Sequence, residues 1–147
     1  MVDELIGAAV RIKAEVVSAD EREGDLRRIL NFGHTIGHAM EAETKYERFL
    51  HGQAVGWGML AVIRLAELTG ELKSCDANSM RELIERYGPL PPATGLSPQK
   101  LVAHLAKDKK TLQGSVHFIL PTAIGHVKIV KDIDNAKIEQ AIVECFN

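Results

Sequence analysis

Four polar side chains between residues 27 and 38 have the types and the spacing of a binding strip. Arg27, Asn31, His34 and His38 follow one another at intervals of four, three and four residues. On one continuous α-helix, which turns by about 100° per residue, these positions fall within an arc of roughly 60°. A guanidinium and an amide offer donors to oxyanions, and neutral imidazoles offer nitrogen ligands to a metal ion. The spacing therefore predicts a site for an anionic ligand and a metal ion.

A third imidazole, that of His51, stands at the start of the next predicted helix and could approach the strip from there. A metal ion held by His34 and His51 would need a third protein ligand, normally a carboxylate, and an open position for substrate. The alternative interpretation is structural. His51 could simply face solvent, and the paired histidines could bond neighbouring carboxylates such as Glu41.

The elements that must position these residues are mostly helices. Helical periodicity and the placement of glycine and proline predict helices over residues 2–18, 26–43, 51–69, 74–88, 98–110 and 135–146. Alternating apolar residues predict a small antiparallel hairpin with strands at 115–120 and 126–131. The expected fold class is therefore mainly α, and the order of elements does not suit a βαβ nucleotide-binding fold.

Glycines inside two of these helices predict close contacts. Gly33 and Gly37 lie in the second predicted helix, and Gly52, Gly56 and Gly58 lie in the third. Each costs a helix roughly 1 kcal/mol relative to alanine. Such a cost suggests that another backbone or a ligand comes close to these positions.

Length and charge narrow the class of protein. The 147 residues suffice for one domain, and the 46% of hydrophobic residues are typical of a globular protein. A formal net charge of −2 gives no support to nucleic-acid binding, and no apolar run is long enough to cross a membrane. Because the first residues do not form a secretory signal, we expect a cytoplasmic protein. Cys75 and Cys145 lack the spacing of a metal site, so we assign them no role.

Two segments resemble the metal-site motifs of the 3-dehydroquinate synthases, within the sugar phosphate cyclase family. They are RRILNFGHTIGHAME at residues 27–41 and LHGQAVGWGM at residues 50–59. The segment RIKAEVVSADEREGDLR at residues 11–27 and the hairpin also fit, so the likeness covers nearly the whole chain. It implies that residues 1–147 form the carboxy-terminal metal- and substrate-binding domain of the dehydroquinate synthase-like fold.

The resemblance implies an activity as well as a fold. The family converts 3-deoxy-D-arabino-heptulosonate 7-phosphate to 3-dehydroquinate and phosphate, a step of the shikimate pathway of aromatic amino acid biosynthesis. Its cofactors are NAD and zinc or cobalt. By the same resemblance, His34 and His51 are metal ligands, whereas the third ligand, a glutamate, and the NAD-binding α/β domain lie upstream of these residues. We therefore expect the chain alone to be inactive, and its relatives imply a homodimer.

Substrate contacts also follow from the resemblance. It assigns catalytic and substrate-binding roles to His38, Arg27 and Asn31, and substrate binding to Lys13. A lysine of the Asp108–Lys110 cluster would bind the substrate phosphate, which points to Lys109 or Lys110. Cations suit a substrate that carries a carboxylate and a phosphate.

Two alternatives stay open at this point. The chain could belong to another sugar phosphate cyclase, of the 2-deoxy-scyllo-inosose or valiolone synthase type, although Lys13 and Arg27 favour a carboxylated substrate. It could also be a non-catalytic helical assembly domain in which the polar strip is inherited but unused.

Overall fold

The computed structural model of the chain describes residues 2–20, 26–87, 89–111 and 116–146, without the side chains of residues 108–111. The elements are α1 (Val2–Ala19), the 3-10 helix η1 (Leu26–Asn31), α2 (His34–Glu43), α3 (His51–Leu68), α4 (Ser74–Arg86), α5 (Pro98–Thr111), β1 (His117–Ala123), β2 (His126–Lys131) and α6 (Asn135–Phe146). The predicted fold class, mainly helical with one antiparallel hairpin, is confirmed.

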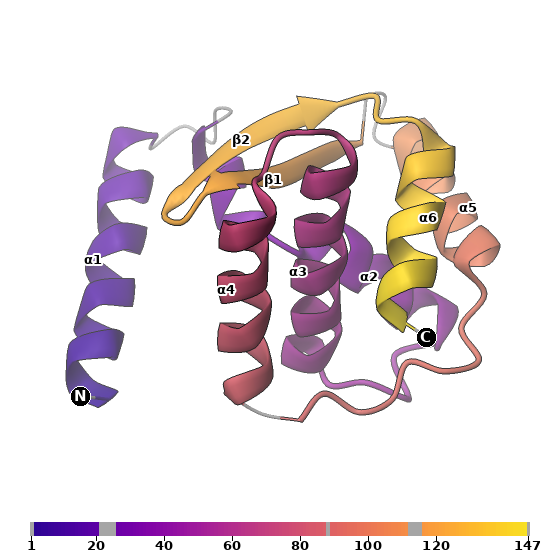
Figure 1. The fold of residues 1–147 in the computed structure, drawn as a ribbon, viewed down its shortest axis with the longest axis horizontal. Coiled ribbons are helices and arrows are strands. Elements are labelled where there is room, and N and C mark those ends of the chain that lie inside the picture. Colours follow the sequence, from indigo (N-terminus) through magenta and orange to yellow (C-terminus); the bar gives the residue numbers. More distant parts are fainter. Residues whose placement is uncertain (1, 21–25, 88, 112–115, 147) are drawn as a thin grey trace.

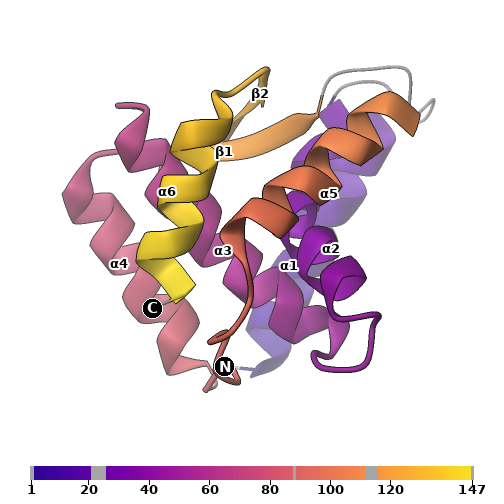
Figure 2. The same ribbon diagram turned by 90° about the vertical axis from the view of Figure 1, so that its right-hand side faces the viewer.

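Helix α3 lies at the centre of the fold. Its buried residues include Ala54, Leu60, Val62, Ile63 and Leu65, which together cover more than one face of the helix. A helix that is apolar on several sides must be surrounded by other elements. Helices α2, α4 and α6 and strand β1 accordingly pack around it, and α5 closes the gap between α2 and α6 (Figures 1 and 2).

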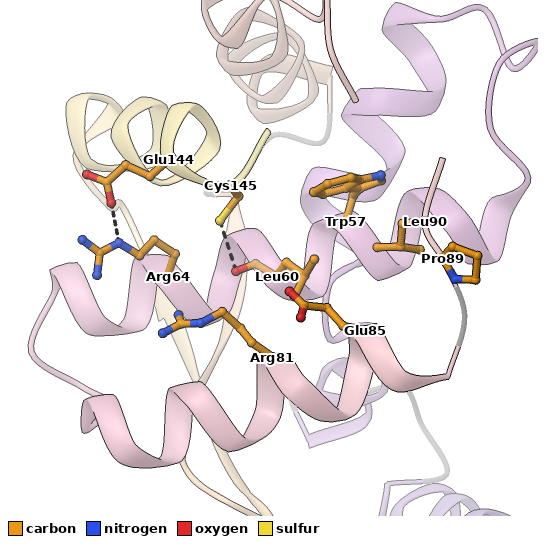
Figure 3. A pocket seen from close by; sticks show the side chains of 9 residues that line it. All are labelled: Trp57, Leu60, Arg64, Arg81, Glu85, Pro89, Leu90, Glu144 and Cys145. Atoms are coloured by element: carbon orange, nitrogen blue, oxygen red, sulfur yellow. Dashed lines mark hydrogen bonds and ion pairs between the residues drawn. The ribbon is translucent and has the colours of Figure 1, made fainter. Parts of the chain in front are cut away.

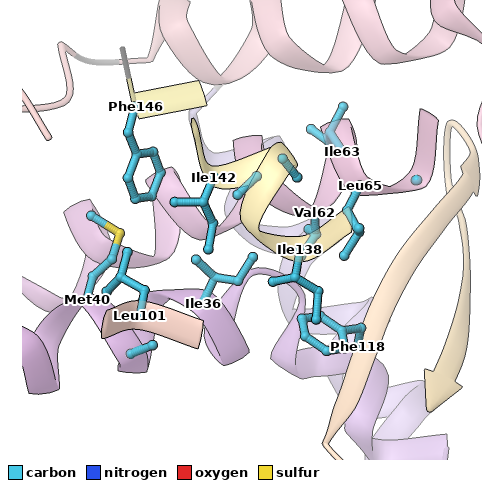
Figure 4. Close-up of a cluster of buried hydrophobic side chains, with 14 of the residues drawn as sticks. Ile36, Met40, Val62, Ile63, Leu65, Leu101, Phe118, Ile138, Ile142 and Phe146 are labelled. Atoms are coloured by element: carbon cyan, nitrogen blue, oxygen red, sulfur yellow. The ribbon is translucent and has the colours of Figure 1, made fainter. Parts of the chain in front are cut away.

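The hydrophobic core forms where these elements meet (Figure 4). Large side chains from five elements are buried there, and they include Ile36 and Met40 of α2, Ile63 of α3, Leu101 of α5, Phe118 of β1 and Ile142 of α6. The apolar side of α2 is thus fixed against the core. The opposite side of α2 is left for polar residues.

The hairpin lies across one end of the helices (Figure 1). Its strands pair antiparallel, with His117 opposite Lys131 and Pro121 opposite Val127, and the register shifts between Pro121 and Ala123. The first strand therefore runs past the predicted limit at residue 120. Pro121 has no backbone N–H to offer, and the pairing becomes irregular directly after it.

Helix α1 stands beside the rest of the domain (Figure 1). None of its residues is buried, and it exposes a set of apolar side chains, namely Val2, Leu5, Ile6, Val10 and Ile12. Within the described residues, no helix has the length and apolar character needed to cross a membrane.

Candidate functional site

The predicted helix over residues 26–43 is broken at Gly33, so the expectation of one continuous helix is wrong. Residues Leu26–Asn31 form a 3-10 helix, and α2 begins at His34. Gly33 adopts the left-handed conformation, with φ of 78°. A Cβ at this position would lie 2.7 Å from the backbone nitrogen of Met59 and 2.8 Å from the carbonyl oxygen of Val55. Glycine is needed here both for its conformation and for its lack of a side chain.

The break divides the predicted polar strip into two parts. Arg27 and Asn31 belong to η1, whereas His34 and His38 belong to α2. Their common helical face therefore does not exist, because the angular spacing is not carried through the left-handed residue. The main-chain N–H of Arg27 is held by the Oδ2 atom of Asp20 at 3.0 Å. His34 and His38 remain one turn apart on α2 and share a face.

Glycines bring the backbones of α2 and α3 close together. A Cβ on Gly58 would overlap the carbonyl oxygen of Gly33, and a Cβ on Gly37 would lie 3.1 Å from the carbonyl oxygen of Ala54. The predicted close approach is confirmed at these three glycines. At Gly52 no protein atom approaches, because an added Cβ would meet nothing within 4 Å.

The crossing of α2 and α3 brings three imidazole rings together. The ring centroids of His34 and His51 are 5.3 Å apart, those of His34 and His38 5.5 Å, and those of His38 and His51 5.8 Å. His51 is the first residue of α3, so the predicted approach of His51 from a second helix is confirmed. The rings therefore form one cluster from two helices.

The buried carboxylate of Glu41 belongs to the same cluster. Its Oε1 atom lies 3.1 Å from Nδ1 of His51, and the side chain of Glu41 is only 8% exposed whereas that of His51 is 58% exposed. From the sequence alone, Glu41 is expected only as a neighbouring carboxylate that could bond the histidines. Its position, three residues after His38 and seven after His34, already placed it on the same face of the helix.

These donors fit a transition-metal ion of the zinc type. One atom from each of His38, Glu41 and His51 lies within 4.8 Å of the others, and the ring of His34 adjoins them. Imidazole nitrogen and carboxylate oxygen are ordinary ligands of zinc and cobalt. The chemistry of the residues present therefore agrees with a metal centre.

The hydrogen bonds of two rings support their predicted role as ligands. Nδ1 of His34 lies 3.2 Å from the carbonyl oxygen of Phe32, and Nδ1 of His51 lies 3.1 Å from the carboxylate of Glu41. Because each of these oxygens is an acceptor, both contacts suit a neutral imidazole that donates from Nδ1 and keeps the lone pair on Nε2. This is the usual arrangement of metal-binding histidines, whose second nitrogen is held by a carboxylate or a carbonyl group.

The remaining predicted site residues lie in other elements. Lys13 is exposed on α1, which stands apart from α2 and α3 in Figure 1, so the described structure does not bring it to the histidine cluster. The backbones of Lys109 and Lys110 belong to α5, but their side chains lie outside the described residues. The role of these lysines stays a prediction.

Helix α5 is fastened to α2 by a second group of charged residues. Lys100 and His104 each place a nitrogen 3.1 Å from a carboxylate oxygen of Glu43. The hydrogen bond from Lys100, followed by that from His104, holds the pKa of Glu43 below its ordinary value. Glu43 is thus a paired carboxylate near the cluster, bonded to a histidine that belongs to another helix.

A separate hollow of about 490 Å³ lies between α3, α4 and α6 (Figure 3). Trp57 and Leu90 form one side of it. Two of its charged side chains are paired across helices, since Arg64 of α3 bonds Glu144 of α6 and Arg81 of α4 bonds Glu67 of α3. The described histidines do not line this hollow. Its charges fasten α3 to its neighbours and do not extend the histidine cluster.

Known proteins are similar to this chain in sequence and in fold. The family model for the 3-dehydroquinate synthase C-terminal domain matches residues 1–111. A 3-dehydroquinate synthase of Solibacter usitatus (strain Ellin6076) is 55% identical over 141 residues, which are 96% of this chain and 40% of that protein. A 3-dehydroquinate synthase of Koribacter versatilis (strain Ellin345) is 47% identical over 98% of this chain and 39% of its own length. The chain thus spans about two fifths of these relatives.

Solved structures agree with the sequence match. A 2-epi-5-epi-valiolone synthase from Streptomyces hygroscopicus subsp. jinggangensis 5008, with NAD+ and Zn2+ bound, gives a TM-score of 0.83 at 28% identity and covers 97% of this chain and 39% of its own. A 2-deoxy-scyllo-inosose synthase shares the fold, with a TM-score of 0.77 at 22% identity over 95% of this chain and 40% of that one. Because the family model matches most of the length of this chain, the chain belongs to the 3-dehydroquinate synthase C-terminal family.

Proposed function

We propose that this chain is the metal- and substrate-binding part of a 3-dehydroquinate synthase. That enzyme would convert 3-deoxy-D-arabino-heptulosonate 7-phosphate to 3-dehydroquinate and phosphate. The observation that carries the proposal is the convergence of His34, His38 and His51 from two helices onto one cluster. The sequence identity of 55% to a 3-dehydroquinate synthase supports this substrate over that of other cyclases.

Within the cluster, His34 and His51 would hold zinc or cobalt through Nε2, because their Nδ1 atoms are engaged by Phe32 and Glu41. The bound metal would polarise a substrate hydroxyl, and NAD would take up and return a hydride. His38, whose ring lies beside both proposed ligands, would contact the substrate. Arg27 and Asn31, on the segment just before α2, would bind its anionic groups.

The 147 residues alone should not turn over this substrate. The relatives named 3-dehydroquinate synthase are about two and a half times as long, and the related valiolone synthase was solved with NAD+ and Zn2+ bound. We propose that an NAD-binding α/β domain must join this chain, and that it brings the third metal ligand. A homodimer of the joined protein is part of the same proposal.

Phosphate release tests the proposal. The purified chain, supplied with zinc, NAD and the heptulosonate phosphate, should release no phosphate above background. A fusion of this chain to the upstream part of the Solibacter usitatus relative should release phosphate steadily, and His38→Asn in that fusion should slow it. Steady turnover by the chain alone would contradict the inactivity of the fragment. A folded fusion without turnover would contradict the proposed reaction.

Another sugar phosphate cyclase is the second candidate, because the valiolone synthase shares the fold over 97% of this chain. The carboxylate of the substrate distinguishes the proposed reaction from those of the other cyclases. In the active fusion, a carboxylated substrate analogue should compete better than a neutral sugar phosphate. Equal competition by the two would favour the other cyclases.

A further inference from the structure

Glu41 is a buried acidic residue in the described part of the chain. Because a buried carboxylate needs a hydrogen-bond partner, the partner indicates why the carboxylate is there. The residue is 6% exposed, whereas the buried residues of the hydrophobic core are apolar. Burying a carboxylate is costly unless hydrogen bonds compensate for lost water. Its Oε1 atom is bonded to Nδ1 of His51, 3.1 Å away on a different helix.

The end of α2 does not need this carboxylate. The backbone carbonyl of Glu41 accepts hydrogen bonds from the N–H of Tyr46 at 2.8 Å and the hydroxyl of Thr44 at 3.3 Å. Those bonds would remain with any residue at position 41. The burial of the side chain therefore needs a separate explanation. Its carboxylate is hydrogen-bonded to Nδ1 of His51.

A carboxylate at Nδ1 decides which nitrogen of His51 carries the proton. An acceptor at Nδ1 favours the tautomer with Nδ1 protonated and leaves Nε2 as the free base. It also fixes the ring about its side-chain bonds, although more than half of the His51 side chain is exposed. An exposed imidazole without such a partner would sample several orientations and both tautomers.

We propose that Glu41 is a positioning residue that holds His51 in the Nδ1-protonated tautomer and in the orientation needed to bind a metal ion. The metal part rests on the proposed function of the cluster, whereas the tautomer can be tested without metal. Partners of this kind in other metal sites change metal affinity by roughly 10-fold to 100-fold when they are replaced.

The first test is a nitrogen NMR spectrum of the metal-free chain, labelled with 15N in its histidines and recorded at about pH 8.5, where an ordinary imidazole is neutral. The His51 signals are assigned by their loss in His51→Ala. In the wild type, Nδ1 of His51 should have the shift of a protonated nitrogen and Nε2 that of a free base. A mixture of both tautomers in the wild type would overturn the proposal without any variant of Glu41.

Variants of Glu41 give the second test. Glu41→Met keeps a side chain of similar length but removes the acceptor, so the tautomer ratio of His51 should shift toward protonated Nε2. Glu41→Gln keeps an oxygen that can accept from Nδ1 and should restore the wild-type tautomer at least in part. Glu43→Gln is the matched control, because Glu43 bonds His104 and Lys100 on α5. It should leave the His51 signals unchanged.

Zinc affinity, measured by competition with a chromogenic chelator, completes the test. Glu41→Met should weaken binding by about 10-fold to 100-fold, Glu41→Gln should weaken it less, and Glu43→Gln should not weaken it. Circular dichroism checks that each variant is folded. If Glu41→Met does not fold, the wild-type tautomer and Glu41→Gln still decide the matter.

The two failures can be told apart. A wild-type chain that binds no zinc but shows the Nδ1-protonated tautomer would contradict the metal site in the proposed function and leave the role of Glu41 in fixing the ring supported. Zinc binding that is equal in wild type and folded Glu41→Met, with the same His51 tautomer in both, would overturn the role of Glu41 and leave the metal site intact.

Discussion

The carbonyl oxygen of Gly33 lies so close to Gly58 that no side-chain carbon fits between them. Gly33 ends the turn before α2, and Gly58 lies in the middle of α3. This contact sets the distance between the two helices that carry His34 and His51. The geometry of the candidate metal site thus depends on two residues that carry no chemistry of their own.

Gly58→Ala should destabilise the fold. The added methyl would overlap the backbone of Gly33, which cannot turn away as a flexible side chain would, and overpacking of this kind costs about 1–3 kcal/mol or more. The free energy of unfolding in urea measures the effect. Gly52→Ala on the same helix is the matched control. Its methyl meets nothing within 4 Å, so this variant should be as stable as the wild type or more stable by up to about 1 kcal/mol.

Zinc should raise the thermal unfolding midpoint of the chain. A ligand that binds only the folded state at 100 times its dissociation constant adds about 2.7 kcal/mol of stability. His34→Ala and His51→Ala should each remove most of the zinc-induced rise, whereas His126→Ala, at an exposed position of the hairpin, should keep it. An equal rise in all four proteins would show that zinc binds elsewhere.

Glu67 should stabilise the fold in a pH-dependent way. Arg81 donates to its Oε2 atom at 2.6 Å and Arg64 at 3.3 Å, and these bonds, with that of Arg81 the stronger cause, lower the pKa of Glu67. A depressed pKa in the folded state means that this stability is present above the unfolded pKa and is lost as pH falls through the folded one. Glu67→Gln should cost about 1–3 kcal/mol at neutral pH.

The difference between wild type and Glu67→Gln should shrink as the pH is lowered below about 4, as measured by urea unfolding at each pH. Glu47→Gln, at an exposed position, serves as the control and should change stability by less than about 0.5 kcal/mol. A difference for Glu67→Gln that stays constant down to pH of about 3 would contradict the assigned ion pairs.

The two cysteines should react at very different rates. Burial raises the pKa of Cys145 from 9.0 to about 11, and its thiol lies 3.6 Å from the carbonyl oxygen of Leu60, whereas Cys75 is exposed. Because the thiolate is the reacting form, Cys75 should react first with a thiol reagent at about pH 8. In Cys75→Ser the remaining half-buried thiol should react much more slowly than Cys75 does in the wild type. Labelling of that variant at the rate of Cys75 would contradict the raised pKa of Cys145.

Raising the pH should also weaken the fold through Cys145. Since the folded pKa is above the unfolded one, the unfolded chain loses its proton first, and stability falls as pH rises past about 9. Cys145→Ser removes this contribution. The decline in unfolding free energy between about pH 9 and 11 should therefore be smaller in Cys145→Ser than in the wild type.

Much of the fold follows from local sequence patterns. The helix predicted from His51 to just before Gly70 is α3, and the one predicted over residues 135–146 is α6 with the same bounds. Both have continuous helical periodicity between clear start and stop residues, which depends only on neighbours along the chain. The motifs around His34, His38 and His51 carried the resemblance to the 3-dehydroquinate synthases, and the family match bears that resemblance out.

The tertiary structure decided what periodicity cannot express. The break falls at Gly33, a left-handed residue whose backbone lies against Met59 and Val55 of α3, within a segment that reads as one helix. The bond between Glu41 and His51 joins residues on different helices, so no angular spacing within one helix could predict which nitrogen it would occupy. The sequence alone determined which chemical groups the chain carries. The packing of α2 against α3 determined which of those groups meet, because contacts between helices depend on backbone distances that are not encoded locally.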